Sequence, residues 1–264
     1  LLISKHSYKF KNGILLDQDF SKPQAFHQTA ISRSGGFAGV ISLNIFFVIY
    51  YLVFLKIYFE YFIVCNLMFL IGFLDDIRTK ISPSKRLILM IVFLFVSIYF
   101  LPIKISNMDI PFLLVLMNNH FFSAVFILLC FLFIVNGANL IDGFNGLLAI
   151  NLIIINSILA YVNIDAGNAE FSVFLIGQLI ILLSFLLFNF PNSKIFFGDS
   201  GSYLMGGLVA LNAIFTNNLN PNYSSFFFCI LLFYLFFEVF FSFTRKVFQR
   251  KSPVHPDEAH LHML

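Results

Sequence analysis

The sequence has no tryptophan, few charged residues and only three cysteines. Charged residues make up 11% of the 264 residues, whereas a typical soluble domain contains about 25%, so we do not expect a soluble globular protein. The formal net charge of +3 is too small to indicate a nucleic-acid partner. Cys65, Cys130 and Cys229 each lie inside an apolar run, without the spacing of a metal site or the density of a disulfide scaffold. We interpret these cysteines as packing residues.

Apolar residues make up most of the chain: 59% of it is hydrophobic, and phenylalanine alone occurs 39 times. A bilayer core about 30 Å thick is crossed by a helix of roughly 20 apolar residues. Several runs near this length alternate with short polar loops, and no repeat or long linker divides the chain. The sequence therefore predicts an all-α polytopic membrane bundle that forms one domain over residues 1–264. About eight transmembrane helices are expected, at residues 37–55, 59–74, 87–103, 112–136, 145–163, 171–189, 202–217 and 225–243.

The basic residues are distributed unevenly between the two sides that these spans define. If the chain alternates sides, one face carries residues 1–36, 75–86, 136–144, 190–201 and the tail from 244. That face holds 14 of the 16 lysines and arginines, and only Lys56 and Lys104 lie on the other. Because cytoplasmic loops carry the excess of positive charge, the sequence predicts that this face is cytoplasmic.

Two adjacent acids end the second predicted span, in residues 72–76 with the sequence GFLDD. Asp75 and Asp76 repel each other and therefore need a cation nearby. The pair can hold a divalent ion, or one carboxylate can act as a base while the other stays ionised. A polar helix terminus without any chemistry explains the pair equally well.

A second polar motif, NGANLIDGFNG, joins two predicted spans at residues 136–146. Asn136, Asn139 and Asp142 recur at every third residue, so a final helical turn presents them on one side. The glycines permit close approach of a ligand, and a purely structural turn has little need of so many amides. We interpret this motif, including Asn145, as a ligand-binding turn.

Two further motifs lie in loops on the same face. Residues 196–202, FFGDSGS, precede an apolar run, and Asp199 is either a functional carboxylate or the cap of the next helix. The tail at residues 250–262, RKSPVHPDEAHLH, places three histidines beside a basic cluster. Three histidines can bind zinc, but these positive surroundings favour a phosphate ligand.

All four motifs fall on the face that the basic residues assign to the cytoplasm, although that topology is derived without them. Carboxylates, amide oxygens, histidines and basic side chains together suit phosphoryl transfer assisted by Mg²⁺, in which positioning and charge neutralisation dominate. No serine-histidine-aspartate triad or thiol nucleophile competes with this interpretation.

With these four motifs in order, the chain resembles the polyprenyl-phosphate N-acetylhexosamine-1-phosphate transferase family, whose members start the lipid-linked synthesis of O-antigen, teichoic acid, capsule and peptidoglycan. The resemblance runs from Asp17 and residues 33–36, RSGG, to the histidine tail. Family members usually carry more spans than the eight counted here, and this chain begins with Leu1 rather than methionine. The resemblance therefore implies that a first helix and the C-terminal end are missing.

The resemblance implies an enzyme of the bacterial inner membrane that uses Mg²⁺, or Mn²⁺ in its place, with its site on the cytoplasmic side. A polyprenyl phosphate then attacks the β-phosphorus of a UDP-sugar and UMP leaves, directly or through an aspartyl-phosphate. The catalytic residues implied are Asp75, Asp76, Asp142, Asp199, His255, His260 and His262, and which of the paired acids is the base stays open. The substrate-binding residues implied are Asn136, Asn139, Asn145, Asn189 and Phe196, and the metal ligands are Asp199 and Asn139. A homodimer is compatible with this family.

The tail distinguishes between donor sugars. Its HPD and HLH segments are similar to the N-acetylhexosamine branch rather than to the contiguous histidines of the peptidoglycan branch. The resemblance therefore implies UDP-N-acetylhexosamine rather than UDP-MurNAc-pentapeptide. Met263 stands where many relatives have a last histidine, which we interpret as a variation in specificity.

Two other classes of function stay open. A transporter also places acids at membrane edges, but the predicted spans carry almost no ionisable residue except Glu238, and a transport path needs polar groups near the midplane. A catalytically silent protein that binds a UDP-sugar also fits the missing last histidine and the truncated chain. Binding without turnover would distinguish that protein from an enzyme.

Overall fold

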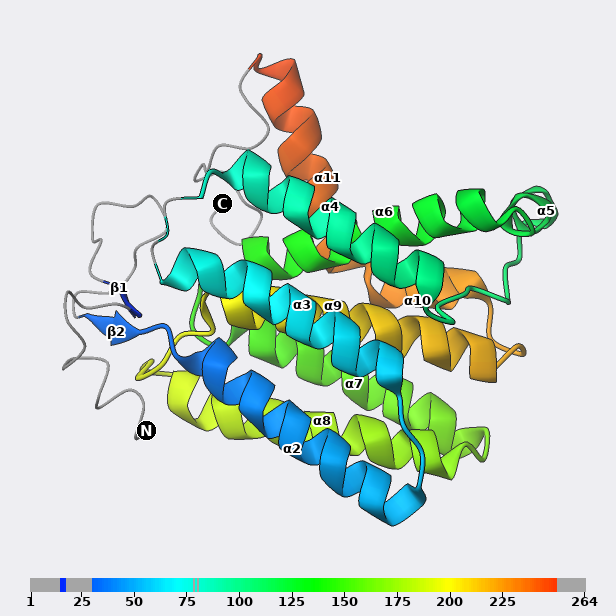
Figure 1. Ribbon diagram of the computed structural model, residues 1–264, viewed down its shortest axis with the longest axis horizontal. Coiled ribbons are helices and arrows are strands. Elements are labelled where there is room, and N and C mark those ends of the chain that lie inside the picture. Colours follow the sequence, from blue (N-terminus) through cyan, green and yellow to red (C-terminus); the bar gives the residue numbers. More distant parts are fainter. Residues whose placement is uncertain (1–14, 18–29, 78, 80, 251–264) are drawn as a thin grey trace.

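The computed structural model describes residues 15–17, 30–77, 79 and 81–250, which form ten helices and a two-stranded antiparallel sheet (Figure 1). The predominance of helix confirms the predicted all-α class. The strands are β1 (Leu16–Asp17) and β2 (Ile31–Ser32). The helices are α2 (Gly35–Phe54), α3 (Phe59–Asp76), α4 (Pro83–Phe100), α5 (Pro111–Met117), α6 (His120–Ile141), α7 (Leu147–Asp165), α8 (Ala169–Asn189), α9 (Gly198–Leu219), α10 (Ser225–Leu231) and α11 (Phe233–Phe248).

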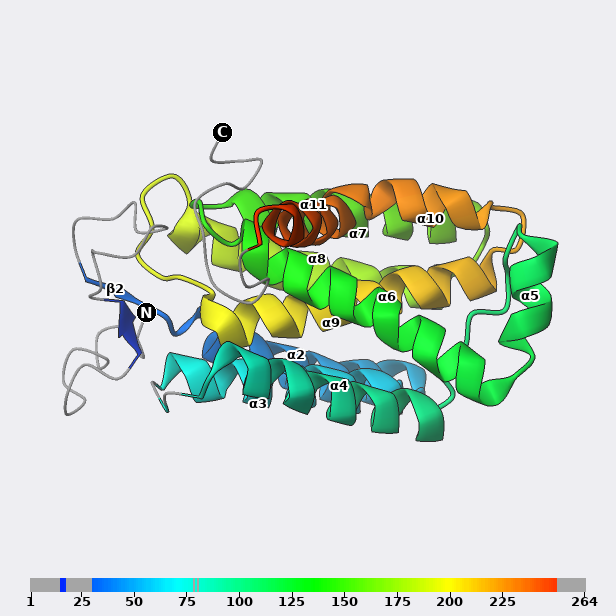
Figure 2. The same ribbon diagram turned by 90° about the horizontal axis from the view of Figure 1, so that it is seen from above.

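The long helices from α2 to α9 run roughly along one direction, so that the helix termini gather at two opposite ends of the bundle (Figures 1 and 2). One end, called the site end below, holds the two strands, the last residues of α3, α6 and α8, and the first residues of α9. The opposite end, called the α5 end, holds α5 and the loop that joins α4 to α5. The described loops that carry the predicted motifs therefore meet at a single end.

Helix α9 occupies the centre of the bundle. Every residue from Ser200 to Ile214 is buried, and the helix contacts α2, α3, α6 and α7. Its glycines allow close packing, because a side chain at Gly206 would come within 2.8 Å of the Val135 backbone in α6. Since other helices cover it, α9 does not need a uniformly apolar surface.

Five described helices are long and apolar enough to cross a membrane, and the bent pair α10–α11 raises the number to six. The chain is therefore a multi-pass membrane protein, although about eight spans were expected. The two other expected spans form α3, which contains three acids, and the covered helix α9. The expected span at 225–243 bends by 67° between α10 and α11, and the one at 112–136 is divided between α5 and α6.

Local sequence accounts for several helix boundaries. Pro83 and Pro111 stand at the first positions of α4 and α5, where a missing N–H costs no helical hydrogen bond. Asn119 begins α6, because its side chain accepts a hydrogen bond from the backbone N–H of Phe122 at 3.0 Å. The division between α5 and α6 thus follows from a capping residue inside an otherwise apolar run.

Buried amides link α7 and α8 to α9. Asn212 of α9 donates hydrogen bonds to Asn156 at 2.7 Å and to Gln178 at 2.6 Å, and all three side chains are buried. A buried amide without partners costs about 1–3 kcal/mol, so mutual pairing holds these helices in one register. Polar groups therefore also lie between the spans, but these amides are neutral and paired, in keeping with the predicted scarcity of ionisable residues there.

Candidate active site

Asp76 closes the N-terminus of α9. Its carboxylate accepts hydrogen bonds from the backbone N–H of Asp199 at 3.1 Å and of Ser200 at 2.9 Å, and only 2% of the residue is exposed. The contact needs Gly198, which has φ of +70° and where a side chain would come within 2.6 Å of the carboxylate. The first N–H groups of a helix lack helical partners and favour negative charge. The capping role considered for Asp199 therefore belongs to Asp76.

Arg86 connects the other two acids of this region. Its Nη1 atom lies 3.2 Å from Asp75 Oδ2 and also pairs with Asp199 Oδ2, so that one cation serves acids from α3 and α9. The Nε atom is buried and has no hydrogen-bond partner among the described residues. The sequence interpretation counted Arg86 only as a loop cation. The sequence did contain a signal for this role: Arg86 lies in the first turn of an apolar helix, and the loop before that helix follows directly on two acids.

Arg33 brings the first loop into the site. Its Nη2 atom donates to Asp17 Oδ2 at 2.7 Å, and its Nη1 atom lies 3.8 Å from Asp76 Oδ1. Burial alone lowers the pKa of this guanidinium, but the charges of Asp17, Asp199 and Asp76 together raise the pKa above its usual value. From the resemblance, Asp17 and the RSGG segment were expected only as part of the first loop. In the structure Arg33 connects them to Asp76, one of the paired acids.

The RSGG segment also packs directly on the loop before α9. The backbone N–H groups of Gly35 and Gly36 donate to the carbonyl oxygens of Phe196 and Phe197, both at 2.9 Å. Phe197 in turn stacks on Phe185, with ring centroids 3.5 Å apart. The first loop and the FFGDSGS loop therefore form one rigid wall of the site.

The last turn of α6 and the polar turn after it approach α9 from another side. Asn139 donates from Nδ2 to Ser202 Oγ at 2.9 Å, and the Ser202 hydroxyl donates to the Asp199 carbonyl at 3.3 Å. Burial, together with the charge of Asp199, raises the pKa of the Asp142 carboxyl well above its usual range. Asn136 instead donates to the carbonyl of Leu132 in its own helix at 2.7 Å.

The remaining predicted binding residues connect two loops. Asn189 accepts a hydrogen bond from the Gly146 N–H at 2.5 Å and donates to the Ile195 carbonyl at 2.9 Å, and it is 5% exposed. Asn145 donates to the carbonyl of Pro191 at 3.0 Å. These amides hold the turn after α6 against the loop that leads into α9. The partly buried Phe196 lies in that same loop.

The donor groups at this end suit a hard divalent ion that also binds phosphate. Mg²⁺ is usually held by one or two carboxylates, with substrate phosphates and water completing its coordination. No three acids, histidines or cysteines in the described ranges lie close enough to hold a metal by themselves. Asp199 offers a carboxylate, which pairs with Arg86, and Asn139, which is linked to the Asp199 backbone through Ser202, offers an amide oxygen. These residues fit Mg²⁺ when phosphate oxygens supply further ligands.

The three histidines of the tail, His255, His260 and His262, lie outside the described residues. Their predicted contact with phosphate therefore stays a prediction, as does the interpretation of Met263. Of the other predicted site residues, the structure brings Asp75, Asp76, Asp199, Asn139 and Asp142 around the first turn of α9.

Comparison with known proteins places this arrangement in a family. The model of glycosyl transferase family 4 matches residues 58–217. A phospho-N-acetylmuramoyl-pentapeptide-transferase of Clostridium perfringens is 31% identical over 152 residues, which cover 54% of this chain and 48% of that protein. The undecaprenyl-phosphate alpha-N-acetylglucosaminyl 1-phosphate transferase of Thermotoga maritima is 31% identical over 141 residues, covering 52% and 41%.

A longer match extends over more of the chain. The phospho-N-acetylmuramoyl-pentapeptide-transferase of Clostridioides difficile is 30% identical over 198 residues, which cover 70% of this chain and 62% of that protein. The chain spans about half the length of most of the curated relatives it matches. Because the family model matches more than half of its residues, the chain belongs to glycosyl transferase family 4.

Proposed function

We propose that the chain transfers a sugar 1-phosphate from a UDP-sugar to a polyprenyl phosphate. An oxygen of the lipid phosphate attacks the β-phosphorus of the donor, the bond between that phosphorus and the bridging oxygen breaks, and UMP leaves with the electron pair. The observation that carries the proposal is the convergence of Asp75, Asp142 and Asp199 on the first turn of α9, at one end of a membrane bundle.

The structure supports different roles for the paired acids. Both oxygens of Asp76 accept backbone hydrogen bonds, so this residue is proposed to position α9 and Asp199. Asp75 pairs with Arg86 and also interacts with Asp199, but 30% of its side chain is exposed. Asp75 is therefore the better candidate to accept a proton from the lipid phosphate.

Three further residues are proposed to act on the donor. Asp199 and Asn139 would hold Mg²⁺, which when bound neutralises charge on the diphosphate. Asp142, whose carboxyl pKa is raised by burial and by the charge of Asp199, is proposed to hydrogen-bond the nucleotide sugar. Asn189 and Asn145 fix the loops that surround this position. Once the donor binds, Arg86 can exchange one of its two carboxylates for a phosphate oxygen.

The donor and the cellular location are also proposed. The names of the matched relatives include both an N-acetylmuramoyl-pentapeptide and an N-acetylglucosaminyl group, and the tail favours a simple N-acetylhexosamine. A peptidoglycan precursor therefore remains a competing donor, and no observation favours O-antigen in particular. The excess of basic residues on this face supports a site that faces the cytoplasm, and a single domain in a bacterial inner membrane is proposed with it. The tail histidines are proposed to contact phosphate.

The test is release of UMP by the purified full-length protein with undecaprenyl phosphate and Mg²⁺. UDP-GlcNAc and UDP-MurNAc-pentapeptide are compared as donors, beside Asp75→Asn, Asp199→Asn and the control Asp165→Asn, which changes an exposed acid at the α5 end. We expect release with one donor, retained in the control and lost in the two site variants. Donor binding without release by the wild-type protein would contradict the proposal and indicate a silent binding protein.

A further inference from the structure

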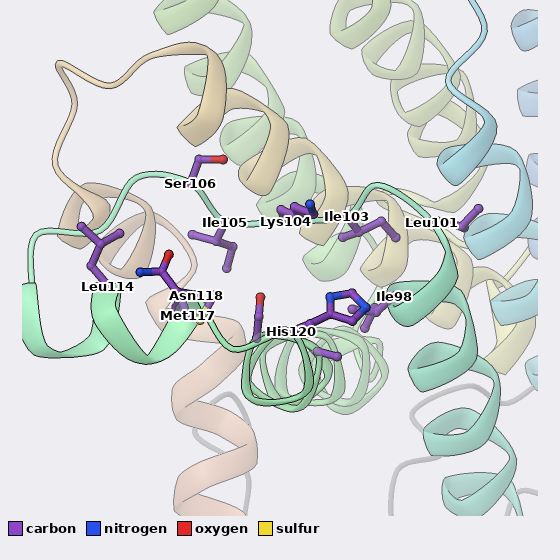
Figure 3. A pocket seen from close by; sticks show the side chains of 12 residues that line it. Ile98, Leu101, Ile103, Lys104, Ile105, Ser106, Leu114, Met117, Asn118 and His120 are labelled. Carbon is purple, nitrogen blue, oxygen red and sulfur yellow. The ribbon is translucent and has the colours of Figure 1, made fainter.

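A second site is formed at the α5 end of the bundle, opposite the acidic cluster. A pocket of about 400 Å³ lies between the end of α4, the loop that follows it, α5 and the start of α6 (Figure 3). Its volume is within the range of small-molecule sites, about 300–1,000 Å³. The proposed reaction at the site end makes no use of this pocket.

The polar part of the lining carries positive charge and hydrogen-bond donors. Lys104, Asn118, His120 and Ser123 all line the pocket, whereas no acid does. Figure 3 shows Asn118 and His120 on the same side of the pocket, below the loop that carries Lys104. In the described structure no hydrogen bond or ion pair engages the Lys104 ammonium group, although its backbone carbonyl accepts a bond from Asn218. The pocket therefore offers unused donors to an anion.

Two other charged residues at this end, Asp109 and Lys56, already have partners. Asp109, in the same loop as Lys104, accepts hydrogen bonds from the hydroxyls of Ser224 at 2.6 Å and Ser225 at 2.8 Å. These bonds hold the pKa of the Asp109 carboxyl below its usual range, so the acid stays ionised and directed at α10. Lys56, the second lysine of this end, pairs with Glu170. Lys104 is thus left without a counter-charge in the part of the chain described.

The rest of the pocket and its surroundings suit a lipid. Ile103 and Ala124 in the lining are each 2% exposed and form an apolar wall. Helix α5 lies across the ends of the long helices (Figure 2) and exposes Phe112 and Val115, which are 72% and 67% accessible. Because α5 is apolar and lies at the ends of the spanning helices, we expect its exposed side chains to contact lipid. A ligand here meets donors on one side and hydrocarbon on the other.

We propose that this pocket binds an anionic glycerophospholipid. Lys104 and His120 contact the phosphate of the headgroup, Asn118 and Ser123 donate to its oxygens, and the first carbons of an acyl chain lie on the apolar wall. The proposal concerns the end opposite the acidic cluster and does not depend on the proposed transferase activity.

Native mass spectrometry of the full-length protein in detergent tests the proposal. The probes are phosphatidylglycerol, a diacylglycerol with the same chains and no phosphate, and soluble glycerol 1-phosphate. The variants are Lys104→Gln, His120→Gln and the control Lys56→Gln, which removes the other lysine of this end. Because each basic residue near a membrane surface contributes about 1 kcal/mol, we expect Lys104→Gln to retain phosphatidylglycerol about fivefold less well than the wild type. His120→Gln should also retain less of this lipid, whereas Lys56→Gln should retain as much as the wild type.

Three results would overturn the assignment. Equal retention of phosphatidylglycerol by Lys104→Gln and the wild-type protein would show that the lysine does not bind the headgroup. Equal retention of diacylglycerol would show that the pocket binds only hydrocarbon. Displacement of phosphatidylglycerol by an equal concentration of glycerol 1-phosphate would show a site for free phosphate esters rather than for a lipid. Since Lys104 is exposed, an unchanged unfolding temperature serves as the check that each variant is folded.

Discussion

Replacing Asp76 with asparagine tests whether this acid holds the site together rather than taking part in the reaction. The side chain of asparagine has nearly the same shape, but its NH₂ group cannot accept the second hydrogen bond from the start of α9. One backbone N–H of Asp199 or Ser200 is then left facing a donor in a region that is 2% exposed. Burial and the charge of Asp199 raise the pKa of Asp76 to about 7, so above this pH the carboxylate charge that favours the helix N-terminus is lost as well.

The expected loss can be worked out from these contacts. A hydrogen bond to a charged acceptor contributes about 1.5–3 kcal/mol, and a buried N–H left without a partner costs about 1–3 kcal/mol. Because these terms overlap, we expect the free energy of unfolding to fall by about 3 kcal/mol. For a chain of this size that corresponds to a decrease of about 6–12 °C in unfolding temperature. The pair of Asp75 with Arg86 is partly buried, but Arg86 keeps Asp199 as a second partner, so we expect loss of the Asp75 charge to cost less, about 1 kcal/mol.

The assay compares the thermal unfolding of wild type, Asp76→Asn and Asp75→Asn in the same detergent and at one scan rate, without Mg²⁺ or substrate. We expect Asp76→Asn to unfold well below the wild type, whereas Asp75→Asn keeps nearly the wild-type temperature but loses UMP release. Asp165→Asn again serves as the control. If Asp76→Asn unfolds at the wild-type temperature, or if Asp75→Asn shows the larger decrease, the division of roles between the paired acids is refuted.

Three further outcomes follow from the same structure. Arg86→Gln removes a cation that pairs with Asp199, so Mn²⁺ should bind about tenfold more tightly, as measured by electron paramagnetic resonance. A tenfold gain corresponds to about 1.4 kcal/mol of binding free energy. Unchanged affinity would contradict competition between the arginine and the metal. Gly36→Ala pushes a methyl group into the α9 backbone and should lower the unfolding temperature, whereas Gly39→Ala meets only side-chain atoms at 3.3 Å and beyond and should be tolerated; similar temperatures would argue against this contact. Folding lowers the pKa of Asp109, so its contribution to stability is present above about pH 4 and is lost as the pH falls further. The unfolding temperature of Asp109→Asn should therefore depend less on pH in the acid range than that of the wild type.

The sequence by itself determined the class of the molecule and the end at which its polar motifs meet. Long apolar runs can satisfy their backbone groups in a membrane only as helices, and alternation of these runs assigns each loop to a side. The loops at 75–86, 136–144 and 190–201 were predicted on one face and do meet at one end of the bundle (Figure 1). Asn119 is a typical N-terminal capping residue, but the sequence did not predict the start of α6 there, because the apolar run continues on both sides of it.

Only the tertiary structure decided what each acid does. In the sequence Asp75 and Asp76 are equivalent neighbours, but successive helical residues point about 100° apart, so one faces Arg86 and the other faces α9. Contacts between segments far apart in the chain decide which helices cover α9. They explain why a helix with buried amides such as Asn212 can occupy the centre of a membrane bundle. Hydropathy along the sequence reports the composition of a helix but not its neighbours. For that reason the helices were predictable, whereas the partners of Asp76 and Arg86 and the pocket beside Lys104 were not.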